Sequence, residues 1–183
     1  MIFKLFWILR ALCYKPFFKK YGWPSYMGKP IFLSGINKVS IGKKVRIFPG
    51  LRMEAIGNQS EIIIGDDVAI AQNVHMTSAG KLRVGSSVTI LDNVFLTNIE
   101  HPYEDIKIPV SKQLFRVMET EIGDNCFIGI GASIQAGTIL GKHCIVGTNA
   151  VVRGVFPDFC VIAGIPAKVI KKFNFETQMW ERV

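Results

Sequence analysis

Residues 122–152 read IGDNCFIGIGASIQAGTILGKHCIVGTNAVV, and an aliphatic residue returns at every sixth position of this stretch. The recurring residues are Ile122, Ile128, Ile134, Leu140, Val146 and Val152. A period of six fits neither the turn of a helix nor the simple alternation of a strand. It fits a solenoid in which each unit of six residues forms one short strand and one tight turn.

A small residue precedes most of these aliphatic residues by two positions, as Ala132 precedes Ile134. Side chains alternate across a strand, so both members of such a pair point to the same face. One small and one branched inward residue allow three strands to close into a narrow triangular coil. Gly often follows the aliphatic residue, and we expect these glycines to adopt turn angles that other residues resist.

The same spacing occurs upstream and predicts where the solenoid begins. Its upstream members are Ile41, Ile47, Ile64, Ile70, Met76, Val84, Ile90 and Leu96. Grouped in threes, the repeats predict about five coils, and a strand spacing of about 4.8 Å makes the column roughly 24 Å tall. The alternative is an ordinary β-sandwich with coincidental spacing, which six consecutive matches disfavour.

The repeat divides the chain into three predicted parts within one domain of 183 residues. Residues 1–35 form a basic, aromatic N-terminal segment. Residues 36–160 form an all-β solenoid domain, from which residues 97–121 depart as a loop. Residues 161–183 form a C-terminal extension, which we expect to contain a short helix.

The composition indicates a cytoplasmic protein. The apolar stretch 5–9 lies between Lys4 and Arg10 and is far shorter than the roughly 20 apolar residues of a membrane span. It lacks a small-residue cleavage site and runs into further lysines, so it is a poor secretory signal. Cys126 and Cys144 occupy the small inward position one coil apart, and we expect them to stack as reduced core residues.

Positive charge is concentrated at the N-terminus. Residues 1–53 contain eleven Lys and Arg but no Asp or Glu, and aromatic residues are interleaved among them. This pattern is typical of a peripheral anchor on an anionic membrane surface. It is equally typical of a helix that covers the open end of a solenoid, and the two roles are compatible. Nucleic acid is not expected as a partner, because no recognition motif accompanies the charge.

The period breaks after Leu96 and resumes at Ile122. Long departures from a rigid scaffold tend to carry function. This one contains His101, whose imidazole is suited to accept a proton near neutral pH. Pro102 restricts His101 to extended backbone, which helps to aim its ring. The apolar residues Leu114, Phe115, Val117 and Met118 indicate that the loop contacts a neighbouring subunit.

The repeat, the broken coil and the sequence Glu100-His101-Pro102-Tyr103 resemble the hexapeptide-repeat acetyltransferases. The nearest branch contains galactoside and maltose acetyltransferases and the O-acetyltransferases of bacterial surface polysaccharides. The likeness covers about residues 36 to 172 and includes residues 122–129 and 163–170. It implies a left-handed parallel β-helix, which is an exception to the right-handed crossover rule. It also implies a homotrimer with active sites between subunits, and acetyl-CoA as a co-substrate without a permanent cofactor or metal.

The resemblance implies a role for each matching position. His101 matches the general base that takes the proton of the acceptor hydroxyl. The positions that match acetyl-CoA contacts are Phe127, Ile130, Thr148, Arg153, Gly154, Lys168 and Lys171. Phe127 replaces the Trp of many relatives, and Gly154 replaces the Lys of some. The acceptor residues transfer poorly, because the family's Asn aligns with Ala71 and leaves Asn73 and Asn98 as the candidates.

The predicted function is acetyl-CoA-dependent O-acetylation of a sugar hydroxyl on a surface glycan, such as a lipopolysaccharide or capsule that is lipid-linked at the cytoplasmic membrane. Two alternatives stay open. One is N-acetylation of a nucleotide-linked amino sugar, because a catalytic base serves either acceptor. The other is a non-catalytic solenoid that docks at membranes. A zinc hydrase is disfavoured, because His75, His101 and His143 occupy different positions of the repeat.

Overall fold

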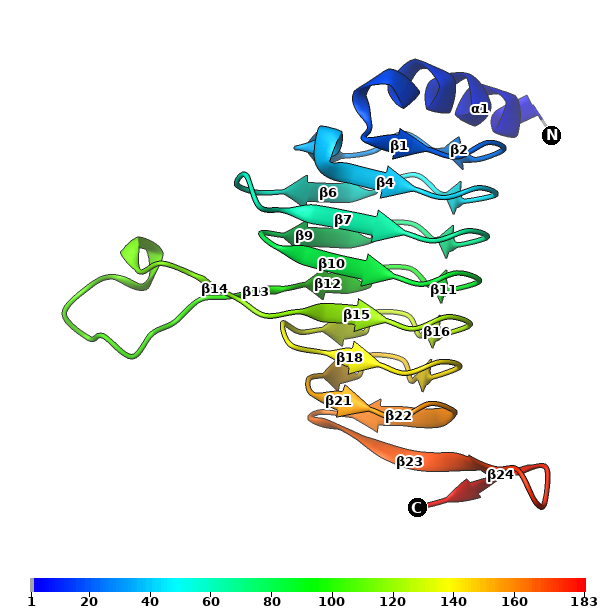
Figure 1. The fold of residues 1–183 in the computed structure, drawn as a ribbon, viewed down its shortest axis with the longest axis vertical. Coiled ribbons are helices and arrows are strands. Elements are labelled where there is room, and N and C mark those ends of the chain that lie inside the picture. Colours follow the sequence, from blue (N-terminus) through cyan, green and yellow to red (C-terminus); the bar gives the residue numbers. More distant parts are fainter. Residues whose placement is uncertain (1) are drawn as a thin grey trace.

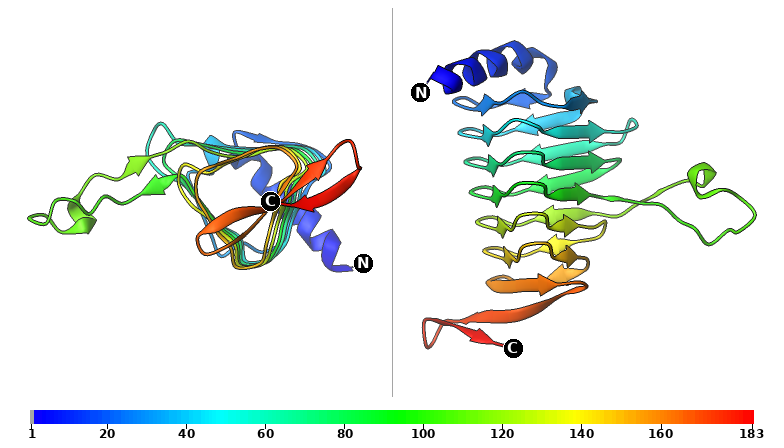
Figure 2. Two further views of the ribbon diagram at one scale, coloured as in Figure 1. Left: turned by 90° about the horizontal axis from the view of Figure 1, so that it is seen from below. Right: turned by 180° about the vertical axis from the view of Figure 1, so that it is seen from behind.

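The structure is a computed structural model that describes residues 2–183. The chain forms a column of stacked coils with a helix at one end and a β-hairpin at the other (Figure 1). The helix α1 spans Ile2–Tyr14, and the hairpin consists of β23 (Ala167–Asn174) and β24 (Met179–Arg182). Short 3-10 helices lie at Lys15–Phe17, Ile36–Lys38 and Val110–Lys112. Viewed along its axis, the column has a triangular cross-section (Figure 2).

Each side of the triangle is one parallel sheet. The first sheet contains β1 (Lys20–Tyr21), β4 (Val39–Ile41), β7 (Glu61–Ile64), β10 (Lys81–Val84), β15 (Thr120–Ile122), β18 (Ile139–Leu140) and β21 (Val155–Phe156). The second contains β2 (Tyr26–Met27), β5 (Arg46–Ile47), β8 (Ala69–Ile70), β11 (Thr89–Ile90), β16 (Phe127–Ile128), β19 (Ile145–Val146) and β22 (Cys160–Gly164). The third contains β3 (Phe32–Ser34), β6 (Arg52–Ala55), β9 (His75–Ser78), β12 (Phe95–Thr97), β17 (Ser133–Ile134) and β20 (Val151–Val152).

The coils wind with a left hand, which confirms the fold class predicted from the sequence. In Figure 1 the near strands β7, β10 and β15 run from left to right while the chain descends, and the return strands lie behind them. Neighbouring sheets meet at three edges of the column. The first edge joins the first and second sheets, and the second edge joins the second and third sheets. The third edge joins the third sheet to the first sheet of the next coil.

The column has seven coils, because the first sheet has seven strands; the prediction of about five was wrong. The first coil begins at Lys20, upstream of the expected start at residue 36, and its strands pair in parallel with those of the next coil. Its inward residues Tyr21, Met27 and Leu33 keep the spacing of six. Tyr21 is aromatic, so the aliphatic pattern in the sequence does not extend to the start of this coil.

The core is a set of vertical columns of identical or similar residues. In the second sheet, Ile47, Ile70, Ile90 and Ile128 lie in direct register from coil to coil. All four side chains are fully buried. Burying a side chain of this size contributes about 1.5–3 kcal/mol, so the repeated aliphatic residue is the main source of cohesion between coils.

The glycines of the first edge are required because neighbouring coils approach each other closely there. They are not required for unusual backbone angles. The residues with positive φ at this edge are Lys44, Asp67, Ser87, Asn125, His143 and Phe159. The preceding glycines have ordinary φ, but a Cβ on Gly123 would lie 2.6 Å from the carbonyl oxygen of Gly141 in the next coil. Our expectation of special angles was therefore wrong at this edge, although it holds at Gly131, whose φ is 68°.

The buried cysteines form a stack along the first edge. Cys126 and Cys144 lie in the core as predicted, and Cys160 continues the stack with its Sγ 3.6 Å from that of Cys144. Burial raises the pKa of Cys160 to about 12, so its thiol stays protonated. Cys160 falls 16 rather than 18 residues after Cys144, because only residues 153 and 154 connect β20 to β21.

Both ends of the column are covered. At the N-terminal end, Trp7 of α1 packs against Tyr26 and Phe48, with ring centroids 5.8 and 5.6 Å apart. Within residues 2–183, no helix is long and apolar enough to cross a membrane.

At the C-terminal end of the column, the prediction of a short helix was wrong. β23 pairs with β22 and β24 pairs with β23, both in antiparallel fashion, because the last strand of the second sheet leaves an edge that only another strand can hydrogen-bond.

We predict that Gly123→Ala destabilises the protein, because its Cβ would overlap the backbone of the next coil. Overpacking of this kind costs about 1–3 kcal/mol, which lowers the thermal midpoint by about 2–4 °C per kcal/mol in a chain of this size. The matched control is Asn125→Gly, two positions away, where φ is 59° and Gly fits. Calorimetry that finds the same midpoint for Gly123→Ala and wild type would contradict the close-approach explanation.

Candidate functional site

Residues 98–119 leave the column at the third edge and project far from it as a two-stranded arm (Figures 1 and 2). Its root is an antiparallel pair of β13 (Ile99–Glu100) and β14 (Arg116–Val117). The arm interrupts the column between β12 and β15, but the coils themselves stay stacked, because β10 pairs directly with β15. The break in the six-residue period therefore inserts an arm without breaking the scaffold.

Buried polar contacts hold the root of the arm in place. Asn98 is fully buried. Its Oδ1 accepts a hydrogen bond from the N–H of Ala79 at 2.9 Å, and its Nδ2 donates to Ser78 Oγ at 2.9 Å. The hydroxyl of Thr120 lies 3.1 Å from the carbonyl oxygen of Thr97 on the opposite side of the root. Asn98, a candidate acceptor residue in the sequence, thus has its whole amide engaged inside the protein.

His101 lies just beyond this root, beside a cavity of about 270 Å³. The cavity is lined by Phe95, Thr97, Ile99, Glu100, His101, Gln135, Ala136 and Arg153. Gln135 and Arg153 come from the third edge of the two coils that follow the arm. His101 is exposed, and its ring contacts Phe115 at a centroid distance of 6.4 Å. The solenoid therefore places the predicted base at an open cavity between arm and column.

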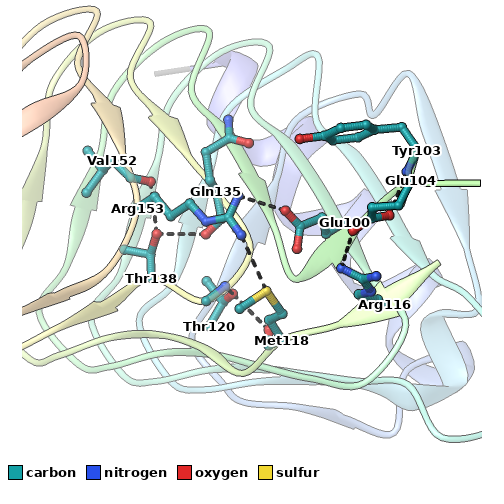
Figure 3. Close-up of polar contacts among 11 residues, drawn as sticks. Glu100, Tyr103, Glu104, Arg116, Met118, Thr120, Gln135, Thr138, Val152 and Arg153 are labelled. Carbon is teal, nitrogen blue, oxygen red and sulfur yellow. Dashed lines mark hydrogen bonds and ion pairs between the residues drawn. The ribbon is translucent and has the colours of Figure 1, made fainter.

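Arg153 reaches from the column toward the arm (Figure 3). Its Nη1 lies 2.7 Å from Glu100 Oε1, and its Nη2 lies 3.8 Å from Met118 Sδ. Both contacts are made to residues on opposite strands of the root. The charge of Arg153 is thus paired next to His101, whereas the sequence assigned this residue to acetyl-CoA.

A second ion pair closes the arm further out, where Arg116 Nη1 lies 2.8 Å from Glu104 Oε1 (Figure 3). Backbone hydrogen bonding at Glu104 itself and the Arg116 guanidinium hold the pKa of this carboxyl below its ordinary value. The pair therefore stays ionised throughout the neutral range. Beyond it, the apolar side chains of Ile106 and Leu114 are 94% and 90% exposed, which is unusual for a segment that ends in solvent.

The other predicted residues lie elsewhere on the chain. Ile130 and Thr148 are on the second edge, and Phe127 faces outward from the adjacent second sheet. Lys168 and Lys171 are on β23, where they line a separate cavity of about 440 Å³ with Arg182. Gly154 is next to Arg153 at the third edge and has a φ of 114°. Within one chain, the structure brings Arg153 and the adjacent Gly154 to the edge that carries His101. It places Phe127, Ile130, Thr148, Lys168 and Lys171 elsewhere.

Asn73 is also distant from His101. It lies in the turn between β8 and β9 on the second edge, with a φ of 56°. Its Nδ2 lies 3.4 Å from Asn93 Oδ1 of the next coil, and it lines an open hollow with Lys29 and Gln72. The structure therefore places the two candidate acceptor residues on different edges, and neither of them lines the cavity at His101.

Sequence reasoning assigned no role to Glu100 or Gln135. Glu100 belongs to the motif that contains His101, but its partner Arg153 is 53 positions away and only the coil stacking shows their contact. Gln135 occupies the polar position after a repeat aliphatic residue, which is a usable signal for an outward side chain. In the part of the chain that the structure describes, no group of three or more His, Cys, Asp or Glu residues is placed to hold a metal ion.

Comparison with known proteins gives the following sequence relatives. The bacterial transferase hexapeptide family (six repeats) matches residues 119–154. An Escherichia coli K12 protein named for lipopolysaccharide biosynthesis O-acetyl transfer, WbbJ, is 32% identical over 160 residues, which cover 84% of this chain and 81% of that protein. The galactoside O-acetyltransferase of the same organism is 28% identical over 115 residues, which cover 63% of this chain and 56% of that protein.

Solved structures share the fold. AntD, an N-acyltransferase from Bacillus cereus solved with dTDP and 3-hydroxybutyryl-CoA, superposes with a TM-score of 0.76 at 17% identity, over 92% of this chain and 90% of that one. A maltose O-acetyltransferase from Clostridium difficile 630 superposes with a TM-score of 0.57 at 20% identity, over 90% of this chain and 75% of that one.

We predict that Asn98→Ala loosens the root of the arm, because it leaves the buried N–H of Ala79 without its partner. An unsatisfied buried donor costs about 1–3 kcal/mol. The expected results are a lower thermal midpoint and faster tryptic cleavage within the arm, at Lys107 or Lys112. Asn58→Ala, an exposed asparagine in a loop, is the control. If Asn98→Ala is cleaved no faster than this control, Asn98 does not anchor the arm.

Proposed function

The chain belongs to the hexapeptide-repeat acetyltransferases, and from that membership we propose that it transfers an acetyl group from acetyl-CoA to a sugar hydroxyl of a bacterial surface glycan. The single observation that carries this proposal is the position of His101 at an open cavity between the arm and the column. The relationship to WbbJ over most of both chains supports the glycan as the acceptor class.

His101 is the proposed general base. A sugar hydroxyl is a weak nucleophile, and a base that removes its proton during attack on the thioester contributes typically about 10²–10⁴-fold in rate. The new bond joins the sugar oxygen to the acetyl carbon, the bond from that carbon to sulfur breaks, and the CoA thiolate takes up a proton. No enzyme-bound acetyl group is needed, which agrees with cysteines that are buried or remote from the cavity.

The carbonyl oxygen of the thioester needs hydrogen-bond donors as it gains negative charge. Gln135 and Ala136 are the residues of the next coil that line the cavity beside His101. They are therefore the proposed donors, through the side-chain amide of Gln135 or the backbone N–H of Ala136, because the backbone N–H of Gln135 already donates to the carbonyl oxygen of Val152. Both are held by the rigid column and not by the arm, so their positions are fixed before the substrate binds.

Lys168 and Lys171 are the proposed contacts for the phosphates of acetyl-CoA. They lie together on β23 beside Arg182, and cationic side chains suit a polyanionic ligand. Phe127, Ile130, Thr148, Arg153 and Gly154 are the further proposed contacts. AntD, whose fold is similar, was solved with an acyl-CoA, which supports a ligand of this class.

The donor and the base meet between two copies of the chain in this proposal. His101 is at the third edge, whereas Ile130 and Thr148 are at the second edge of the same column. Side-by-side packing in a homotrimer sets the third edge of one column against the second edge of another. The exposed apolar residues Ile106 and Leu114 near the end of the arm supply a surface that reaches the neighbour.

N-acylation of a nucleotide-linked amino sugar is the second candidate function. AntD is an N-acyltransferase solved with dTDP, and its fold matches along nearly the whole of this chain. The O-acetyl proposal is favoured, because sequence identity to WbbJ is 32% whereas identity to AntD is 17%. We also propose that the glycan acceptor is lipid-linked and that the protein acts at the cytoplasmic face of the membrane.

We predict that His101→Ala lowers kcat for acetyl transfer by at least about 100-fold, the range expected for a lost general base, with little change in the KM for acetyl-CoA. Lys168→Ala is the comparison variant, for which we expect the opposite pattern in kcat and KM. It raises the KM for acetyl-CoA and leaves kcat nearly unchanged, because a phosphate contact is the same in the ground and transition states. Steady-state measurement of thiol release distinguishes the two, and a His101→Ala variant within threefold of wild type rules out its assigned role.

We predict that the protein is a homotrimer whose assembly requires the arm. Ile106→Asp with Leu114→Asp places two charges where the arm would contact its neighbour, so the trimer dissociates and acetyl transfer is lost together with it. Met179→Asp, at an exposed apolar residue of the C-terminal hairpin, leaves the trimer intact. Light scattering at micromolar concentration is the measurement. A wild-type monomer with full activity contradicts this assembly.

A further inference from the structure

The helix α1 lies across the N-terminal end of the column (Figures 1 and 2). It has two apolar faces. The inner face packs on the first coil through Trp7 and the fully covered Ala11. The outer face is exposed and apolar as well. Its residues are Leu5 and Phe6, each 58% exposed, Leu9 at 50% and Leu12 at 46%, and Phe17 continues it at 63%.

Capping the column does not explain the outer face. A helix that covers a core on one side ordinarily carries polar residues on the side that faces water. End caps of solenoids likewise need a polar outer surface to stay soluble. Here the exposed positions of α1 include two pairs of large apolar residues, Leu5 and Phe6, then Leu9 and Leu12, so the helix has a second apolar surface that the monomer leaves uncovered.

The charges around this face have one sign. Lys15 of the 3-10 helix that follows α1 and Lys20 of β1 are exposed, Lys4 of α1 is exposed with its Nζ 6.0 Å from the centre of the Tyr26 ring, and residues 1–53 contain no acidic residue. Lys19 is paired with Glu61 in the third coil of the column, at 2.7 Å, which leaves the other three without an ion-pair partner among the described residues. An apolar stripe with a cationic rim complements a surface that is apolar below and anionic above.

We propose that Leu5, Phe6, Leu9 and Leu12 on the outer face of α1, together with Phe17 of the 3-10 helix that follows it, dock on an anionic lipid bilayer. The helix has 13 residues, so it lies in the plane of the interface with its apolar face buried among the headgroups and upper acyl chains. This docking surface is independent of the acyl-transfer chemistry, and each can fail without the other.

Docking through α1 sets the height of the candidate site above the membrane. The helix crosses the end of the column, so the axis of the column stands away from the bilayer (Figure 1). The cavity at His101 is about four coil steps from the first coil, or about 20 Å at the spacing of parallel strands. The helix adds about 10 Å. A membrane-linked acceptor must therefore present its sugar about 30 Å from the lipid, which favours an extended glycan chain over a single lipid-linked sugar.

The trimer proposed above would strengthen docking. Cyclic symmetry turns the same end of each column to the same side. Three copies of α1 would then face one membrane, and their binding would be multivalent. Weak binding by a single helix would be sufficient for stable association of the assembly.

Vesicle flotation tests the docking surface on the full-length protein. The expected result is binding to phosphatidylcholine vesicles that contain phosphatidylglycerol, little binding to phosphatidylcholine alone, and weakening by salt. Leu5→Ser with Leu9→Ser lowers the affinity at least tenfold, and Lys15→Gln with Lys20→Gln lowers it about fivefold for each lysine removed. Neither pair changes acetyl transfer to a soluble sugar acceptor.

The controls change matched residues at the other end of the column. Ile165→Ser with Met179→Ser removes two exposed apolar side chains of similar size, at 73% and 62% exposure. Lys142→Gln with Lys172→Gln removes two exposed lysines. Both control pairs retain wild-type vesicle binding. Loss of binding in these controls, absence of binding by the wild type at low salt, or equal binding to zwitterionic vesicles overturns the proposal.

A fluorescent label tests the orientation. Cys13 on α1 is exposed while the other three cysteines are buried, so a thiol-reactive, environment-sensitive dye attaches there selectively. Its emission rises on anionic vesicles, and spin-labelled lipid quenches it. The same dye at Glu176→Cys, in a Cys13→Ser background, stays in water because residue 176 is at the opposite end. Equal quenching of the two labels overturns the upright arrangement.

Discussion

The stacking of one coil on the next is the interaction on which the rest of this structure depends. Each coil is hydrogen-bonded in parallel to its neighbours on three sides, and its inward aliphatic residues lie directly over those of the coil below. The glycines of the first edge bring the backbones within contact distance, as at Gly123 and Gly141. The result is a rigid column, and His101, Arg153, Ile130 and Thr148 are positioned at its edges.

The rigidity of the column explains how an arm of about twenty residues can carry His101, the proposed general base. The column is continuous past the arm, because β10 of the coil before the arm pairs directly with β15 of the coil after it. Asn98 and Thr120 fix its root with buried hydrogen bonds, and Arg153 joins the root to the column through Glu100. His101 is therefore held near the column, while the rest of the arm is free to reach another copy of the chain.

The repeat predicted the fold well because each of its positions has one physical role. It missed the first coil, since the aromatic residue Tyr21 fills the inward position of its first strand. It also missed the C-terminal hairpin, which exists to satisfy the free edge of β22. The site was harder to predict. His101 stood out in the broken repeat, but the pairing of Arg153 with Glu100 depends on coil stacking over a long sequence separation, and no local pattern records it.

The central claim is that this column presents His101 to a sugar hydroxyl for acetylation by acetyl-CoA. The most direct test is to incubate the protein with acetyl-CoA and paired acceptors, which are sugars that differ only in a hydroxyl or an amine, and to locate the transferred acetyl group by mass spectrometry. The account predicts CoA release with an O-acetylated glycan as the product. An acetyl group found only on nitrogen, or no release of CoA with any sugar, would contradict it.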